Sequence, residues 1–255
     1  RTDPQYYAGL ESRLSQALGD VWQRVSFQPV LYAPILQQAQ DDLWQRMLDE
    51  PTNQLRAKTI RRFLLDGLSD AASLENSASR DPRQYIAVQM LIYQALEQAF
   101  IALGHQEKPV IIVAHSLGAQ VVSNYLWDAQ KNLQLFAQQM NLDSPLDRFT
   151  RLKSCARLIT TGCNIPLFVG GLNELTCFKP PNPKFVWDNY YDADDVLGWP
   201  IAQLSASYQA VVADHPVRVG NFLTGWNPLS HNGYWTSSNV YQPIVRAILQ
   251  GLDRA

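Results

Sequence analysis

The feature that most constrains the fold is an unbroken apolar run, Val110–Ala114, made mostly of β-branched residues. Such a run is typical of a strand that is buried on both faces of a parallel sheet. Apolar residues at helical spacing follow between Gly118 and Tyr125, so a helix begins within a few residues of the strand's end. The segment therefore predicts a strand, a tight turn and a helix in direct succession.

Similar apolar segments recur along the chain and alternate with helical patterns. Further strands are predicted at 156–161, 185–190 and 217–220, and at 25–32 an edge strand, because Pro29 cannot donate a ladder hydrogen bond. Helices are predicted at 4–19, around 36–48 and 55–68, at 82–104 and at 240–252. This alternation predicts a doubly wound, mostly parallel α/β sheet flanked by helices.

The length of the chain, 255 residues, fits one α/β domain spanning residues 1–255, because a single core of this size buries most of the apolar surface. One stretch, 162–184, is rich in Gly, Pro and Asn and is too long for an ordinary connection. We expect it to be a functional loop or a mobile flap.

Charge and composition exclude several classes of partner. The 21 basic and 23 acidic side chains are interspersed and sum to a formal net charge of -2, so no strong field attracts nucleic acid. No apolar run approaches the roughly 20 residues of a transmembrane segment. The four histidines show no metal-ligand spacing, and neither a metal nor a cofactor is predicted. Nothing in the sequence indicates an oligomeric state.

The cysteines bear on the cellular compartment. Cys155, Cys163 and Cys177 lack the paired spacing of a zinc site or a disulfide framework. They are predicted to be free thiols, which favours a cytoplasmic protein. One disulfide plus a spare thiol in a secreted protein is the alternative.

The turn after the first buried strand reads Ala114-His115-Ser116-Leu117-Gly118. It matches the nucleophile-elbow pattern G-x-S-x-G with alanine in the first position, where a small residue lets strand and helix approach each other. Ser116 is therefore predicted to be a catalytic nucleophile, with His115 in a packing or supporting role. The alternative is that Ser116 only caps the helix.

A serine nucleophile needs a base, and of the histidines only His215 and His231 follow the turn in the chain. His215 stands at the start of a predicted strand. His231 stands in a polar loop just before the last helix, where a serine hydrolase of this topology carries its base. His231 is therefore the preferred base, and His215 is interpreted as a surface or strand-end residue.

Three carboxylates follow the predicted strand 185–190, which is the position of the acid that orients such a base. Asp195 precedes an apolar pair and Gly198-Trp199-Pro200, so it is the preferred acid. Asp192 and Asp194 remain alternatives. Three neighbouring carboxylates could also form a cation site.

Together these residues resemble the α/β-hydrolase superfamily, and within it the lipase and esterase branch. The elbow resembles the A/G-H-S-L-G motif of those enzymes, and Thr160-Thr161-Gly162 with Pro166 is similar to the strand end that follows it. Asp195-Val196-Leu197 with Pro200 resembles the acid loop, and Ser230-His231 with Tyr234-Trp235 resembles the histidine loop. The resemblance covers about Val110 to Trp235.

The resemblance implies hydrolysis of a carboxylic ester through an acyl-enzyme intermediate, with the N–H of Leu117 as an oxyanion donor. The same triad serves thioesterases, amidases and acyltransferases, and a non-catalytic binding module on this scaffold is a further alternative. Enzymes of this type open with a strand and an oxyanion loop that do not occur here. We expect both upstream of residue 1, and inserted helices near 36–68.

The substrate is expected to be a small-molecule ester, with an apolar acyl chain only mildly favoured. Four apolar residues near the candidate triad could line an acyl pocket: Leu167, Phe168, Trp199 and Trp226. Aromatic residues beside a sheet more often belong to the core, which is the alternative for the tryptophans.

Overall fold

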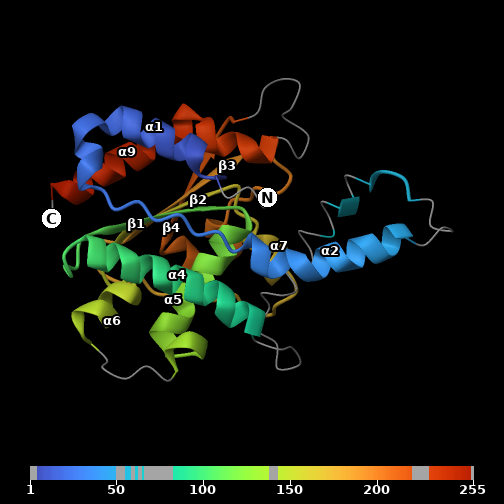
Figure 1. Ribbon diagram of the computed structural model, residues 1–255, viewed down its shortest axis with the longest axis horizontal. Coiled ribbons are helices and arrows are strands. Elements are labelled where there is room, and N and C mark those ends of the chain that lie inside the picture. The colour runs from blue at the N-terminus through green and yellow to red at the C-terminus, as the bar shows by residue number, and fades with distance from the viewer. Residues whose placement is uncertain are drawn as a thin grey trace.

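The computed structural model describes residues 5–49, 55–58, 61–62, 65, 83–137, 143–219 and 230–253. Its centre is a sheet of four parallel strands in the order β1-β2-β3-β4 (Figure 1). The strands are β1 Val110–His115, β2 Cys155–Thr161, β3 Val186–Asp192 and β4 Val212–Val217. Because all four run the same way, the loops after their carboxyl ends meet at one edge of the sheet.

Helices cover both faces of this sheet, as the predicted α/β class requires. Helices α1 and α9 pack on one face, and α4 and α5 lie on the other (Figure 1). The α-helices are α1 Ala8–Leu18, α2 Ala33–Asp49, α4 Arg83–Ala102, α5 Leu117–Lys131, α6 Pro145–Thr150, α7 Ile165–Val169, α8 Ala206–Gln209 and α9 Ser238–Leu252. The 3-10 helices are η1 Gly19–Arg24, η2 Gln134–Phe136, η3 Ala202–Leu204 and η4 Ser230–Thr236.

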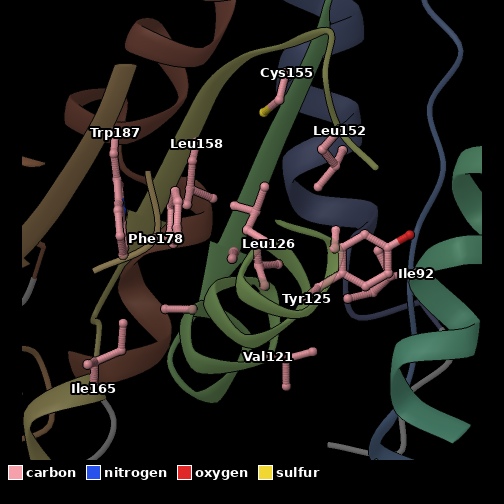
Figure 2. Packing of buried hydrophobic residues seen from close by; sticks show 14 of the residues in the cluster. Ile92, Val121, Tyr125, Leu126, Leu152, Cys155, Leu158, Ile165, Phe178 and Trp187 are labelled. Carbon is pink, nitrogen blue, oxygen red and sulfur yellow. The ribbon is translucent and has the colours of Figure 1, made fainter. Parts of the chain in front are cut away.

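The core beneath α4 and α5 anchors the helix that follows the elbow. Val121, Tyr125 and Leu126 project from α5 and are almost fully buried, and Figure 2 shows them among side chains of the sheet and α4. The Tyr125 hydroxyl donates to the carbonyl oxygen of Thr150 at 2.7 Å, so this buried polar group keeps a partner. The buried face of α5 is thereby packed on the core and fastened to the end of α6.

A buried polar ladder ties the later strands together. Thr160, Asn189 and Asp214 lie opposite one another on β2, β3 and β4. The Asn189 amide donates to the Asp214 carboxylate at 2.7 Å and to the carbonyl oxygen of Trp199 at 2.9 Å. The loop after β3 is thereby fastened to the sheet.

The structure confirms most predicted elements: the strand-turn-helix from Val110, the strands at 156–161 and 185–190, and the helices now seen as α1, α2, α4 and α9. The predicted helix 55–68 lies largely outside the described residues. None of the described helices is long and apolar enough to cross a membrane.

Three local predictions are wrong. The segment 25–32 forms no strand; it packs Val25 and Phe27 on one core and Val30 and Tyr32 on the other. The last strand runs over Val212–Val217 and not from 217 to 220. Residues 110–113 are only partly buried, because β1 is an edge strand of the sheet that the described residues form.

The predicted free thiols are confirmed for all three cysteines, which are buried and unpaired with one another. Burial raises the pKa of Cys155, Cys163 and Cys177 to about 12. A thiol with so high a pKa is a weak nucleophile at neutral pH, so these groups belong to the core.

The predicted flap, 162–184, contains α7 and otherwise no regular secondary structure. Its second half is anchored. Phe178 is buried and stacks on Trp187 with ring centroids 5.2 Å apart, and the Cys177 N–H donates to the Ser207 hydroxyl at 2.9 Å. The longest exposed stretch is 170–174.

Candidate active site

Ser116 stands alone between the last residue of β1 and the first residue of α5. Its φ is 55° and its ψ is −125°, a strained conformation for a residue with a side chain. The Ser116 N–H donates to the carbonyl oxygen of Thr161 at 2.9 Å, which ties the turn to the end of β2. A Cβ atom added at Gly118 would lie 3.7 Å from the Cβ of Ala114, so strand and helix approach each other closely. This is the backbone that the elbow pattern predicts.

Leu117 is the first residue of α5, and its side chain is buried. The first N–H groups of a helix have no partner within the helix. The N–H of Leu117 is therefore available to an oxygen atom that binds beside Ser116.

The preferred base and acid are in direct contact. His231, in η4, places its Nδ1 2.8 Å from Oδ2 of Asp195, and both residues are buried, with 1% and 4% of their surfaces exposed. The Tyr234 hydroxyl donates to the same Oδ2 at 2.9 Å, and the Leu197 N–H donates to Oδ1 at 3.1 Å. The carboxylate thus holds the imidazole through Nδ1, which leaves Nε2 as the basic atom.

The three neighbouring aspartates have different surroundings. Asp192 turns into the protein, where Oδ2 accepts from the Val219 N–H at 2.6 Å and Oδ1 from the Asp194 N–H at 3.0 Å. Asp194 is exposed. Only Asp195 contacts His231, and no group of three or more ligand side chains that could hold a metal occurs in the described part of the chain.

The pKa of Asp195 lies below its ordinary value of 3.8. Burial by itself raises this pKa, but the hydrogen bond and charge of His231, together with the donors Leu197 and Tyr234, outweigh burial and lower it. The ionised carboxylate is therefore the stable form at neutral pH.

This lowered pKa predicts how stability depends on pH. A group whose pKa is lower in the folded state stabilises that state above its unfolded pKa, and the stabilisation is lost as pH falls through the folded pKa. We expect the excess of the wild type's free energy of unfolding over that of Asp195→Asn to shrink as the pH falls below about 4. Urea denaturation between pH 2 and 7 measures this difference; a gap that stays constant to pH 2 would contradict the assignment.

Two glycines make room for the pair. Gly162 has a φ of +53°, and a Cβ there would lie 2.8 Å from Cε1 and 3.0 Å from Nδ1 of His231. A Cβ at Gly198 would lie 2.6 Å from Oδ2 of Asp195. Sequence reasoning did not assign a role to Gly198 or to the Tyr234 hydroxyl. The sequence offered one signal for them: Gly198 lies three residues after Asp195, and Tyr234 three residues after His231. Such proximity in the chain does not establish a contact.

His115 connects the elbow to the histidine loop, in agreement with its predicted supporting role. Its ring centroid lies 4.6 Å from that of His231, with the ring planes at 39°, and 5.4 Å from that of Trp235. Its Nδ1 lies 3.1 Å from the carbonyl oxygen and 3.0 Å from the hydroxyl of Thr161. The residue before the candidate nucleophile thus contacts the candidate base.

Ser116 and His231 lie at the same end of the sheet, but they are not hydrogen-bonded to each other. The Ser116 N–H is hydrogen-bonded to the carbonyl oxygen of Thr161. The residue after Thr161, Gly162, packs against His231. Nε2 of His231 is buried and has no hydrogen-bond partner among the described residues. Hydrogen bonds of a catalytic site are often completed only when substrate binds.

His215 has a different environment. Its Nε2 lies 2.8 Å from Oδ1 of Asp188, and its ring stacks on Tyr190 with centroids 4.8 Å apart. It is partly exposed on the edge strand β4. The interpretation of His215 as a strand-end residue is wrong, because β4 begins at Val212 and His215 lies within it; the partial exposure agrees with the surface part of that interpretation.

The predicted acyl-pocket residues lie partly on the surface. Leu167 and Trp199 expose 52% and 41% of their area, and Phe168 is partly buried against the core. The Trp199 N–H donates to the carbonyl oxygen of Cys163 at 2.9 Å, which places it beside Gly162. Trp226 lies outside the described residues.

Comparison of the chain with protein-family models, with curated proteins and with solved structures finds no match.

Proposed function

We propose that this protein is a serine hydrolase that cleaves carboxylic esters through an acyl-enzyme intermediate. The observation that carries the proposal is the buried hydrogen bond between Asp195 and His231, which leaves Nε2 without a described partner at the same end of the sheet as Ser116. A buried imidazole oriented by a carboxylate is suited to accept a proton. The α/β-hydrolase fold is part of this proposal.

In the proposed reaction, the Ser116 hydroxyl oxygen attacks the ester carbonyl while Nε2 of His231 takes its proton. The N–H of Leu117 donates to the oxyanion of the tetrahedral intermediate. When the intermediate collapses, His231 returns the proton to the departing alcohol. Water, deprotonated by the same nitrogen, then attacks the acyl carbonyl; as this second intermediate collapses, the acid is released and Nε2 returns the proton to the Ser116 oxygen. Asp195 stabilises the imidazolium each time it forms.

An apolar acyl chain fits the surroundings better than a charged one. Trp199, whose N–H binds the residue after Gly162, and Leu167, five residues after Gly162 in the chain, present exposed apolar surface, and Gly162 packs against His231. Contact with these side chains would remove apolar surface from water, worth about 0.8 kcal/mol per methylene group. We therefore propose that longer acyl chains are preferred over acetate.

The test is to treat the purified protein with a fluorophosphonate probe and to locate the adduct by mass spectrometry of its peptides. We expect one adduct, on Ser116, together with turnover of p-nitrophenyl octanoate that exceeds that of the acetate. An adduct on another serine, or a protein that neither reacts with the probe nor hydrolyses either ester, would contradict the proposal and favour a binding module on the same scaffold.

A further inference from the structure

An open cavity of about 850 Å³ lies at the end of the sheet opposite Ser116 and His231. It is bounded by the segments that enter β1, β2 and β3 and by the last turns of α9. Sites for small organic ligands span roughly 300–1,000 Å³, so the cavity is large enough for one. The proposed hydrolase chemistry uses none of its lining residues.

The lining is strongly cationic. Four basic side chains contribute to it: Lys108, Lys153, Arg157 and Lys184. Among the described residues that line the cavity, Glu107 is the one carboxylate. The positive charges therefore outnumber the negative ones on this surface.

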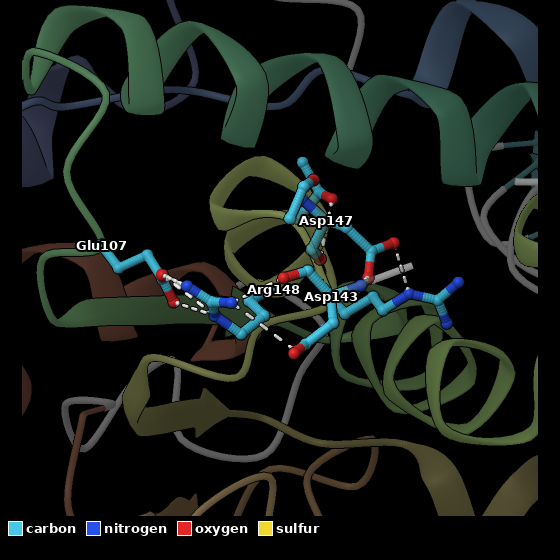
Figure 3. A network of polar contacts seen from close by, with 7 residues as sticks. Glu107, Asp143, Asp147 and Arg148 are labelled. Atoms are coloured by element: carbon cyan, nitrogen blue, oxygen red, sulfur yellow. Dashed lines mark hydrogen bonds and ion pairs between the residues drawn. The ribbon is translucent and has the colours of Figure 1, made fainter. Parts of the chain in front are cut away.

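The single acid is already neutralised. Nε of Arg148 donates to both carboxylate oxygens of Glu107, at 3.0 and 3.1 Å, and Figure 3 shows this pair within a larger network. Arg157 is in turn paired with Asp188 of β3. Neither pair leaves a net charge, so the remaining field of the cavity comes from its lysines.

Asn182 ties together the backbone segments that carry two of these lysines, Lys153 and Lys184. The Asn182 amide nitrogen donates to the carbonyl oxygens of Lys153, at 2.9 Å, and Cys155, at 2.7 Å, while its oxygen accepts from the Lys184 N–H at 2.9 Å. Neither Lys153 nor Lys184 forms an ion pair with a described residue. Two lysines on neighbouring segments of the lining complement a dianion.

Another part of the cavity wall is apolar. Pro109, Ala247 and Gly251 contribute to it, and a Cβ on Gly251 would lie 3.7 Å from the Cβ of Pro109. The carboxyl end of α9 lies on this wall and carries partial negative charge, which disfavours an anion there. The anionic group of a ligand would therefore lie beside the lysines, and the neutral part of the same ligand would lie beside α9.

We propose that this cavity binds a small organic phosphate monoester, with its phosphate between Lys153 and Lys184 and its apolar body against Pro109, Ala247 and Gly251. A phosphate monoester carries about −1.5 to −2 charges at pH 7, which matches two ammonium groups better than a single carboxylate does. The proposal is independent of the proposed hydrolase activity.

The test is isothermal titration calorimetry of the full chain with phenyl phosphate, inorganic phosphate and benzoate. We expect saturable 1:1 binding of phenyl phosphate, with an affinity at least fivefold higher than that of inorganic phosphate or of benzoate. The double variant Lys153→Ala/Lys184→Ala should lower the affinity for phenyl phosphate at least tenfold. Lys179→Ala removes an exposed lysine outside the cavity and should leave the affinity within twofold.

Thermal unfolding without ligand, unchanged in the double variant, establishes that the loss reflects binding and not misfolding. Absence of saturable binding by the wild type would overturn the proposal. So would an equal loss in Lys179→Ala, which would reflect only the overall charge. Binding of benzoate as tight as that of phenyl phosphate would overturn the assignment to a phosphate monoester.

Discussion

Replacement of Asp195 by asparagine is expected to lower the kcat of ester hydrolysis about 10⁴-fold. The amide cannot accept the Nδ1–H of His231 with the strength of a carboxylate, and it favours the tautomer in which Nε2 carries the hydrogen. The base is then unable to take the serine proton. Steady-state kinetics with p-nitrophenyl octanoate measure the loss.

Asp194→Asn is the matched control, because it makes the same chemical change one residue away, on an exposed side chain. We expect its kcat to stay within about twofold of the wild type, as is usual for a solvated surface charge. An equal loss in both variants, or a loss confined to Asp194→Asn, would show that the acid is assigned to the wrong residue.

Replacement of Gly162 by alanine is expected to disable the site and destabilise the fold together. The new methyl group would lie 2.8 Å from Cε1 of His231, so the imidazole must shift. A displacement of about 1 Å in a catalytic group can lower the rate 10²-fold. The left-handed backbone costs an alanine about 1–2 kcal/mol, and overpacking adds about 1–3 kcal/mol.

Gly19→Ala separates the two causes, since Gly19 has nearly the same φ, +54°, and a Cβ there would meet nothing within 4 Å. We expect it to lose about 1 kcal/mol of unfolding free energy and no activity. Urea denaturation and kcat of both variants give the comparison. If Gly162→Ala behaves like Gly19→Ala in both measurements, His231 does not occupy the position that the structure assigns to it.

The local parts of the fold could be predicted because their signals lie close together in sequence. The run Val110–Ala114 and the helical spacing after Gly118 predicted β1, the turn and α5, and the structure has all three. Apolar periodicity similarly predicted α9. Burial against one sheet requires these patterns whatever the rest of the chain does.

The errors arose where structure depends on distant neighbours. Residues 25–32 have strand composition, but a strand needs a hydrogen-bonded partner, and the described chain places none beside them. The same cause explains why β1 is less buried than its composition predicts. A strand's sequence shows its preference for a sheet and not its position in that sheet.

For the candidate site, the sequence by itself determined which residue types were available and their order: a serine after the first buried strand, acids after the third, and a histidine before the last helix. It favoured Asp195 and left Asp192 and Asp194 as alternatives. Only the tertiary structure shows which of them contacts His231, because Asp192, the last residue of β3, binds Val219, and the turn that follows brings Asp195 to His231. Three adjacent carboxylates have the same chemistry, and their roles differ only through the partners that the folded chain brings to each.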